Sequence, residues 1–90
     1  MKAVITVIGK DRPGIIATVS GALFEYNANI LDISQTVMQD HIFTMIMLID
    51  YEKVAVSFPE FKEALAKCAK EVGMELNIQR EEIFESMHRV

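Results

Sequence analysis

Apolar residues along the chain repeat in two ways, alternately as in strands or at three-to-four-residue spacing as in helices. Residues 2–8 are mostly apolar and β-branched up to Gly9, and residues 42–49 form a second, nearly unbroken apolar run. These two segments predict strands that are buried on both faces. Residues 30–39 and 74–79 alternate apolar with polar side chains, which predicts strands with a single buried face.

Two segments between these strands carry apolar side chains at helical spacing. The apolar positions of the first, which follows Gly14, are Ile15, Ile16, Val19, Leu23 and Tyr26. Those of the second are Phe61, Leu65, Cys68 and Val72. Ser57 and Glu60 have the spacing of a capping box, in which each side chain accepts a hydrogen bond from an amide of the first turn. The second helix therefore begins at Ser57, and Gly73 ends it.

The resulting order, βαββαβ, predicts a single α+β domain over residues 1–90 with the ferredoxin-like fold. Its four strands form an antiparallel sheet, and its two helices cover one face of that sheet. The first and third strands are apolar on both faces, so we expect them to be the central strands. The second and fourth strands alternate, so we expect them at the edges.

The sheet face without helices is expected to be apolar, and such a face usually marks an interaction surface. Its predicted side chains are Val4 and Ile8, or their neighbours, with Ile46 and Leu48. One candidate cover is a short C-terminal helix with Ile83, Phe84 and Met87 on one side. The other is a second subunit, bound through the sheet face or through the edge of the second strand. We expect at least a homodimer.

Composition narrows the classes of function. The net charge is −4 and no Lys/Arg run is present, which argues against a nucleic-acid partner. No segment approaches the roughly 18 apolar residues of a membrane span, and the N-terminus lacks the features of a signal peptide. We expect a cytoplasmic protein. Cys68 is the single cysteine, and neither His41 nor His88 has a second ligand at metal spacing, so we expect no metal and no cofactor.

The loop before the first helix is the strongest candidate site. The amides at a helix N-terminus favour a carboxylate or phosphate group. Asp11 lies in the same loop and could form a salt bridge with an ammonium group, so the loop carries what a free amino acid requires. In the alternative interpretation, Asp11 caps the helix and Gly14 only permits close packing.

The segment Gly9–Ala17 contains Asp-Arg-Pro-Gly between a strand and a helix, and Gly21 follows it. Further along are Asn27–Ile30, where Asn-Ile begins 15 residues after Gly14, and Asp32–Thr36. In these residues the chain resembles ACT domains, most closely the stand-alone ACT proteins and those of formyltetrahydrofolate deformylase and the glycine-cleavage repressor. As a pattern the resemblance covers nearly the whole chain.

The resemblance implies a ligand site at a dimer interface, formed by the first loop and the start of the second strand, often from the partner chain. The residues concerned are Asp11, Arg12, Pro13, Gly14, Ile15, Asn29 and Ile30. Asn29 could offer both a donor and an acceptor, or it could serve only as a turn residue. Gln35 lies on an otherwise apolar strand face. A buried glutamine there would contact the ligand or the other subunit; the alternative is a bulge or partial exposure.

We therefore expect a regulatory module that binds a small molecule, an amino acid above all, as a homodimer. A regulated protein would be a further, unidentified partner, since no enzymatic domain is attached to these 90 residues. The alternative is a homodimer that mediates protein interaction without a ligand. An enzyme of the acylphosphatase type would use Arg12 with Asn29 or Asn77, but the phosphate-cradling loop of that family is not seen. The sequence predicts a protein that is not an enzyme.

Overall fold

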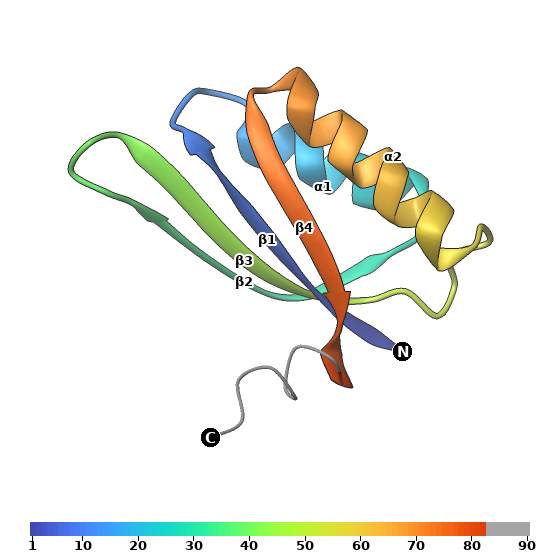
Figure 1. The fold of residues 1–90 in the computed structure, drawn as a ribbon. Helices are drawn as coiled ribbons and strands as arrows, with labels where there is room; N and C mark the ends of the chain where they lie inside the picture. The colour runs from blue at the N-terminus through green and yellow to red at the C-terminus, as the bar shows by residue number, and fades with distance from the viewer. Residues whose placement is uncertain (83–90) are drawn as a thin grey trace.

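The computed structural model describes residues 1–82, and its elements follow the predicted βαββαβ order (Figure 1). The elements are β1 (Lys2–Lys10), α1 (Ile15–Glu25), β2 (Asn29–Val37), β3 (Ile42–Asp50), α2 (Phe58–Glu71) and β4 (Met74–Arg80). The predicted C-terminal helix with Ile83, Phe84 and Met87 lies outside the described residues.

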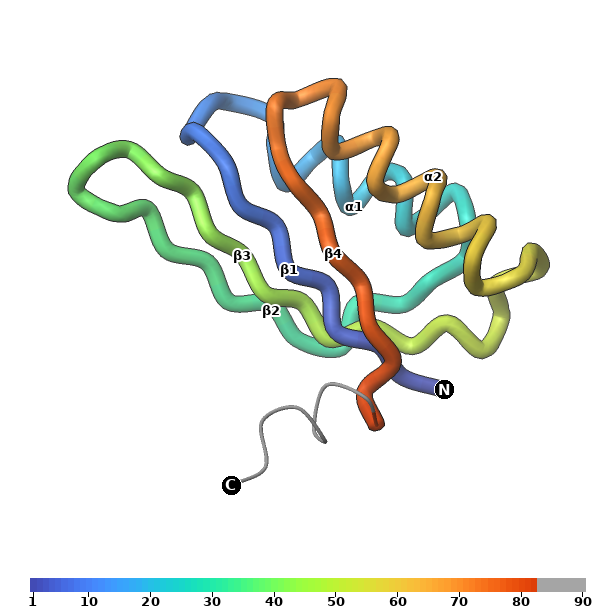
Figure 2. Tube along the Cα trace, viewed as in Figure 1, coloured from blue at the N-terminus to red at the C-terminus, as the bar shows by residue number. Residues whose placement is uncertain are grey.

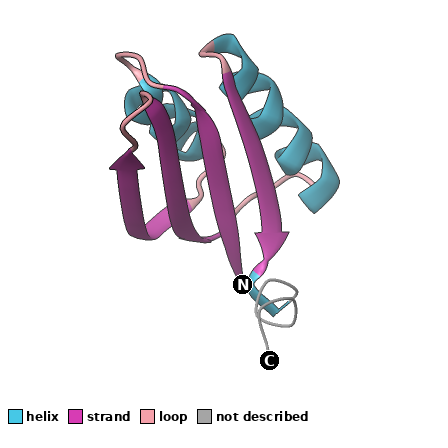
Figure 3. Cartoon of the chain, turned by 60° about the vertical axis from the view of Figure 1, so that its left-hand side comes forward, coloured by secondary structure: helices cyan, strands magenta, loops and turns pink. Residues whose placement is uncertain are grey.

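The four strands form one antiparallel sheet in the order β2-β3-β1-β4. The two doubly apolar strands are central and the two alternating strands are edges, as the sequence predicts. Both helices lie on the same side of the sheet, and no element of residues 1–82 covers the other side (Figures 1 and 3). The predicted ferredoxin-like fold is confirmed. We call the helix-free side of the sheet the open face.

The strand ends differ from the prediction in one instructive place. β1 does not stop at Gly9 but continues to Lys10, because Gly9 is itself paired with Phe43 on one side and Met74 on the other. A Cβ atom on Gly9 would lie 2.7 Å from the carbonyl oxygen of Gly73. This glycine therefore marks a close approach inside the sheet, where the sequence suggested a boundary.

The core lies between the sheet and the two helices. On α1 it contains Ile15, Val19 and Leu23, and on α2 it contains Phe61, Leu65 and Ala69. The predicted stripe of α2 included Cys68 and Val72, which are only half-buried. The buried positions repeat at four-residue intervals, so those two residues fall on the shoulder of the stripe. Cys68 instead faces α1, where its thiol lies 3.6 Å from the carbonyl oxygen of Thr18.

The hairpin of β2 and β3 extends beyond the helices, and this decides which side chains are covered (Figure 2). Ile33 and Val37 pair with Met47 and Phe43 of β3, so their side chains lie on the helix side of the sheet. Met47 and Phe43 are buried, but Ile33 and Val37 are exposed because neither helix covers β2. The edge strand thus keeps an apolar strip on the outside of the molecule.

Candidate functional site

The first loop, residues 11–14, is fixed to the turn between β2 and β3. The backbone amide of Asp11 donates a hydrogen bond of 2.8 Å to the carbonyl oxygen of His41. His41 has a positive φ of 63°, which turns the chain back into β3. The side chains of Asp11, Arg12 and Pro13 are exposed. The loop is therefore held by its backbone, while its side chains remain free to contact a ligand.

The N-terminus of α1 has no capping side chain within the described chain. Its N-cap residue is Gly14, with φ 89°, and Asp11 makes no capping hydrogen bond there. At α2, by contrast, the Glu60 amide donates to the Ser57 hydroxyl oxygen at 3.3 Å. A Cβ atom on Gly14 would meet nothing within 4 Å. The alternative interpretation is thus wrong on both counts: Asp11 does not cap α1, and Gly14 is required by its positive φ and not by close packing.

Ile15 contributes to this loop only through its backbone. Its side chain is buried in the core between the sheet and the helices. Its amide is one of the first in α1, which have no acceptor inside the helix. The predicted site residues at this end of the molecule therefore offer amides from α1 and side chains from Asp11 and Arg12.

Asn29 and Ile30 lie at the opposite end of the sheet. Asn29 pairs with Asp50, which pairs with Lys2 at the beginning of β1, whereas the first loop follows Lys10. Eight residue steps along a strand correspond to roughly 26 Å. Within one chain the structure does not bring the two predicted halves of the site together. The same separation divides Arg12 from Asn29 and removes the acylphosphatase-like pairing within a single chain.

A polar hollow of about 240 Å³ surrounds Asn29. It is lined by Asn27, Asn29, Asp50, Glu52 and Lys53. The Asp50 carboxylate accepts hydrogen bonds from the Glu52 amide at 2.9 Å and from the N-terminal ammonium at 3.4 Å. The first of these contacts, aided by the ammonium group and opposed by partial desolvation, holds the pKa of Asp50 below its ordinary value. An ionised acceptor therefore stands beside Asn29.

Sequence reasoning missed the other polar residues of this hollow. They come from the α1–β2 turn, from the last residue of β3 and from the chain after it, and these segments are far apart in the sequence. Asn27, which has a positive φ of 62°, was named only as part of the segment that carries the family resemblance. The register that places Asp50 opposite Asn29 could have been found only by aligning the two strands.

Gln35 is exposed on β2, so the premise of a buried glutamine is wrong and its partial-exposure alternative holds for the single chain. It faces the helix side, opposite Met45, with Ile33 and Val37 as its neighbours on that side. No strand of the described residues lies beside the outer edge of β2. A β-bulge between Ile30 and Asp32 interrupts the pairing with β3.

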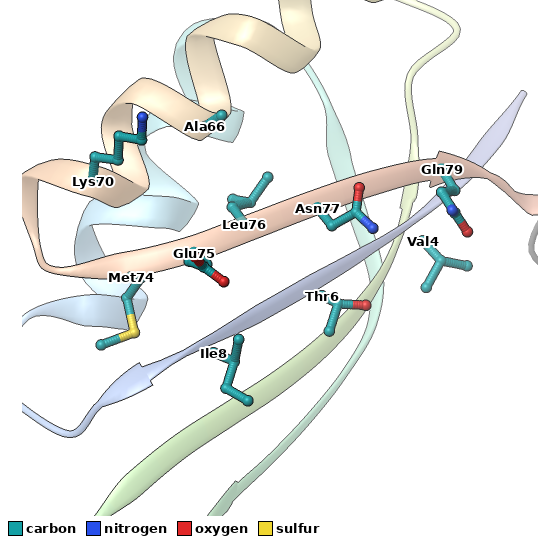
Figure 4. A pocket seen from close by; sticks show the side chains of 10 residues that line it. All are labelled: Val4, Thr6, Ile8, Ala66, Lys70, Met74, Glu75, Leu76, Asn77 and Gln79. Atoms are coloured by element: carbon teal, nitrogen blue, oxygen red, sulfur yellow. The ribbon is translucent and has the colours of Figure 1, made fainter.

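Another hollow, of about 530 Å³, follows the edge strand β4 (Figure 4). Its side chains come from both sides of that strand: Leu76 points toward α2 and Lys70, whereas Glu75, Asn77 and Gln79 lie on the open face with Val4, Thr6 and Ile8. A strand separates the two groups, so the hollow consists of two shallow grooves. Asn77 lies in the outer groove, away from the loop that carries Arg12.

Two further findings concern residues 1–82. No three His, Cys, Asp or Glu side chains in this range are grouped so that they could hold a metal ion. No helix in it has the length and apolar character needed to cross a membrane.

The chain resembles known proteins over its whole length. The family model of the ACT domain matches residues 2–79. A UPF0237 protein of Clostridium acetobutylicum is 57% identical over 90 residues, which cover 100% of both chains. An ACT domain protein from Streptococcus pneumoniae is 41% identical, and its structure matches with a TM-score of 0.82 over 98% of both chains. A formyltetrahydrofolate deformylase from Pseudomonas syringae is 27% identical, with a TM-score of 0.79 over 88% of this chain and 27% of that one.

The protein belongs to the ACT domain family, and the resemblance carried by its first loop and second strand is confirmed. ACT domains are in general regulatory modules that bind small molecules.

Proposed function

We propose that this protein is a regulatory module that binds a free amino acid between two copies of the chain. The observation that carries the proposal is the uncapped N-terminus of α1, where amides without an intrahelical acceptor stand beside the exposed side chains of Asp11 and Arg12. Amides at a helix N-terminus favour a carboxylate. The protein acts by binding and not by catalysis, and we expect it in the cytoplasm.

Antiparallel pairing of β2 with β2 of a second copy supports a shared site. A two-fold axis beside Ser34 pairs the five residues Asp32–Thr36 with the same five residues of the second copy, and it keeps both helix layers on one side. The axis reverses the direction of the partner's strand. Asn29 of the partner subunit then lies beside residues 37–39, next to the turn that accepts the Asp11 amide. The first loop and Asn29, which lie roughly 26 Å apart within one chain, are thereby brought close together across the two subunits.

The chemistry of such a site matches an α-amino acid. The α1 amides and Arg12 of one subunit donate hydrogen bonds to the carboxylate of the ligand. Its ammonium group is bound by Asp11 and by the amide oxygen of the partner subunit's Asn29, near the ionised Asp50 of the partner subunit. Gln35, exposed on the same edge strand, supplies a polar group at the subunit boundary. Ligand binding shifts how the two copies, or a regulated protein, associate, and association shifts ligand affinity equally.

Isothermal titration calorimetry against the twenty amino acids tests this proposal on the purified full chain. We expect at least one ligand, and we expect Asn29→Ala to weaken its binding at least tenfold. The matched control is Asn77→Ala, since Asn77 is also an exposed asparagine on an edge strand. Equal binding by N29A and the native chain would contradict the shared site.

A homodimer without a ligand is the second candidate, because the apolar strip on β2 favours self-association whether or not a ligand binds. Sedimentation separates the two: association of the native chain, combined with no heat from any of the twenty amino acids, supports the second candidate and defeats the first.

A further inference from the structure

The open face carries a regular array of side chains that the β2 site does not use. The strand register places three rows across it, each in the strand order β2, β3, β1, β4. The rows are Asp32, Leu48, Val4, Gln79; then Ser34, Ile46, Thr6, Asn77; then Thr36, Thr44, Ile8, Glu75. The two central columns are mostly apolar and the two edge columns are polar, which is the usual anatomy of a protein interface.

Part of this apolar centre is open to solvent. Ile8 is 43% exposed and Ile46 is 46% exposed, whereas Val4 on the same face is only 8% exposed. The expectation of an open apolar face therefore holds for Ile8 and Ile46 and is wrong for Val4. Leu48 is half-buried.

We infer that a second copy of the chain stacks on the open face, and that this contact is separate from the one at the β2 edge. The area is sufficient. Four strands at about 4.8 Å and nine residues at about 3.3 Å give a plane of roughly 550 Å² per copy. Two copies together cover roughly 1,100 Å², which clears the approximate threshold for a biological interface.

The face is complementary to itself in charge. A two-fold axis that crosses the strands along the Ser34–Asn77 row exchanges the first row with the third. Asp32 then faces Thr36 of the second copy, and Glu75 faces Gln79, so each carboxylate meets a hydrogen-bond donor. Ile46 lies on the axis and meets Ile46 of the second copy. Lys2 and Lys10 approach each other only at the rim, so added salt should strengthen the contact.

The stacking axis along the Ser34–Asn77 row also gives a closed assembly. It meets the two-fold axis of the β2 pair at a right angle near Ser34, and two perpendicular two-fold axes that intersect generate a dihedral assembly of four chains. An axis parallel to the strands would instead produce an open ribbon. Stacking itself does not depend on the proposed function, but the count of four chains rests on it.

Two substitutions separate the contacts in the full chain. Ile46→Asp places like charges on the stacking axis, and Ile33→Asp does so near the centre of the β2 pair. The two isoleucines are a matched pair, because Ile46 is 46% and Ile33 is 42% exposed, on opposite faces of the sheet. Sedimentation velocity is measured on each, with circular dichroism to verify the fold. Ala17→Lys, on the exposed surface of α1, controls for an added charge.

We expect the native protein to sediment as an assembly of four chains, I46D and I33D as assemblies of two chains each, and the double variant as a single chain. Native dimers that I46D leaves intact would overturn the stacking and leave the β2 site standing. Native dimers that I46D separates and I33D does not would support the stacking and defeat the β2 pair. A folded I46D variant whose assembly has the same mass as that of the native protein, but whose stability is lower, would indicate that residues 83–90 cover the open face. That result would overturn the inference.

A mixing experiment sharpens the result. Ile46→Lys should dissociate as Ile46→Asp does, because each repels itself across the axis. An equimolar mixture of the two should recover the native mass, since opposite charges then face each other. Failure of the mixture to recover it would contradict an axis through Ile46.

Discussion

Thr44 shows how a single polar atom can be isolated inside the sheet. It lies on the open face between Ile8 and Thr36, and its buried hydroxyl oxygen has no hydrogen-bond partner among residues 1–82. A buried hydroxyl without a partner typically lowers stability by about 1–3 kcal/mol. The threonine shape fits the strand, but its hydroxyl does not contribute.

Thr44→Val should therefore increase the free energy of unfolding by about 1 kcal/mol, because valine keeps the shape and removes the unpaired oxygen. Urea denaturation followed by circular dichroism measures the change. Thr36→Val is the matched control, and both substitutions are made in the Ile46→Asp background, where no second copy is expected on the open face: Thr36 is the neighbouring threonine on that face but is exposed, so its substitution should change stability by less than about 0.5 kcal/mol. A loss of stability in T44V would show that water or another group satisfies the hydroxyl.

At the scale of elements, the two helices begin in different ways. α2 begins with Ser57, Pro59 within its first turn and the acidic Glu60, whereas α1 begins at Gly14 with no acidic residue in its first turn. The first arrangement stabilises a helix, and the second leaves its amides for another group.

Ser57→Ala should lower the free energy of unfolding by about 1 kcal/mol, since it removes the acceptor for the Glu60 amide. The comparison variant is Ser20→Ala, inside α1, where the hydroxyl makes only a 3.4 Å bond to the Ala17 carbonyl oxygen. Alanine is a better helix former than serine, so S20A should be neutral or slightly stabilising. Equal losses in the two variants would argue against capping by Ser57.

The elements also show what a sequence can predict. Periodicity places all four strands and both helices, because alternate and helical spacing each report which face is buried. It does not report how far a helix reaches across the sheet, and for this reason the side chains of Ile33 and Gln35 are exposed where burial was expected. Nor does it report that Asn29 and the first loop lie at opposite ends, since that follows from strand pairing over long sequence distances.

At the scale of the whole molecule, residues 1–82 form two layers (Figure 3). The helices cover one side of the sheet, and within this range both the open face and the β2 edge carry apolar side chains that are exposed to water. Small domains are marginally stable alone, and association adds the burial that they lack.

The melting temperature should consequently rise with protein concentration, by roughly 5–10 °C for a hundredfold increase, because association stabilises only the folded chain. Scanning calorimetry at several concentrations measures this. The variant that combines I33D and I46D should melt at one temperature throughout. A native melting temperature that does not depend on concentration would contradict self-association.

The bulge after Ile30 sets a limit on any strand that joins the β2 edge. Before the bulge, the pairing of β2 with β3 is shifted by one residue relative to the pairing after it. Only the six residues Asp32–Val37 therefore present an uninterrupted row of backbone groups. In the pair centred on Ser34, five of these residues face one another, and a second copy that slides toward the bulge by two residues keeps only three. A short edge of this kind therefore allows few alignments, which limits the edge-to-edge growth of the sheet.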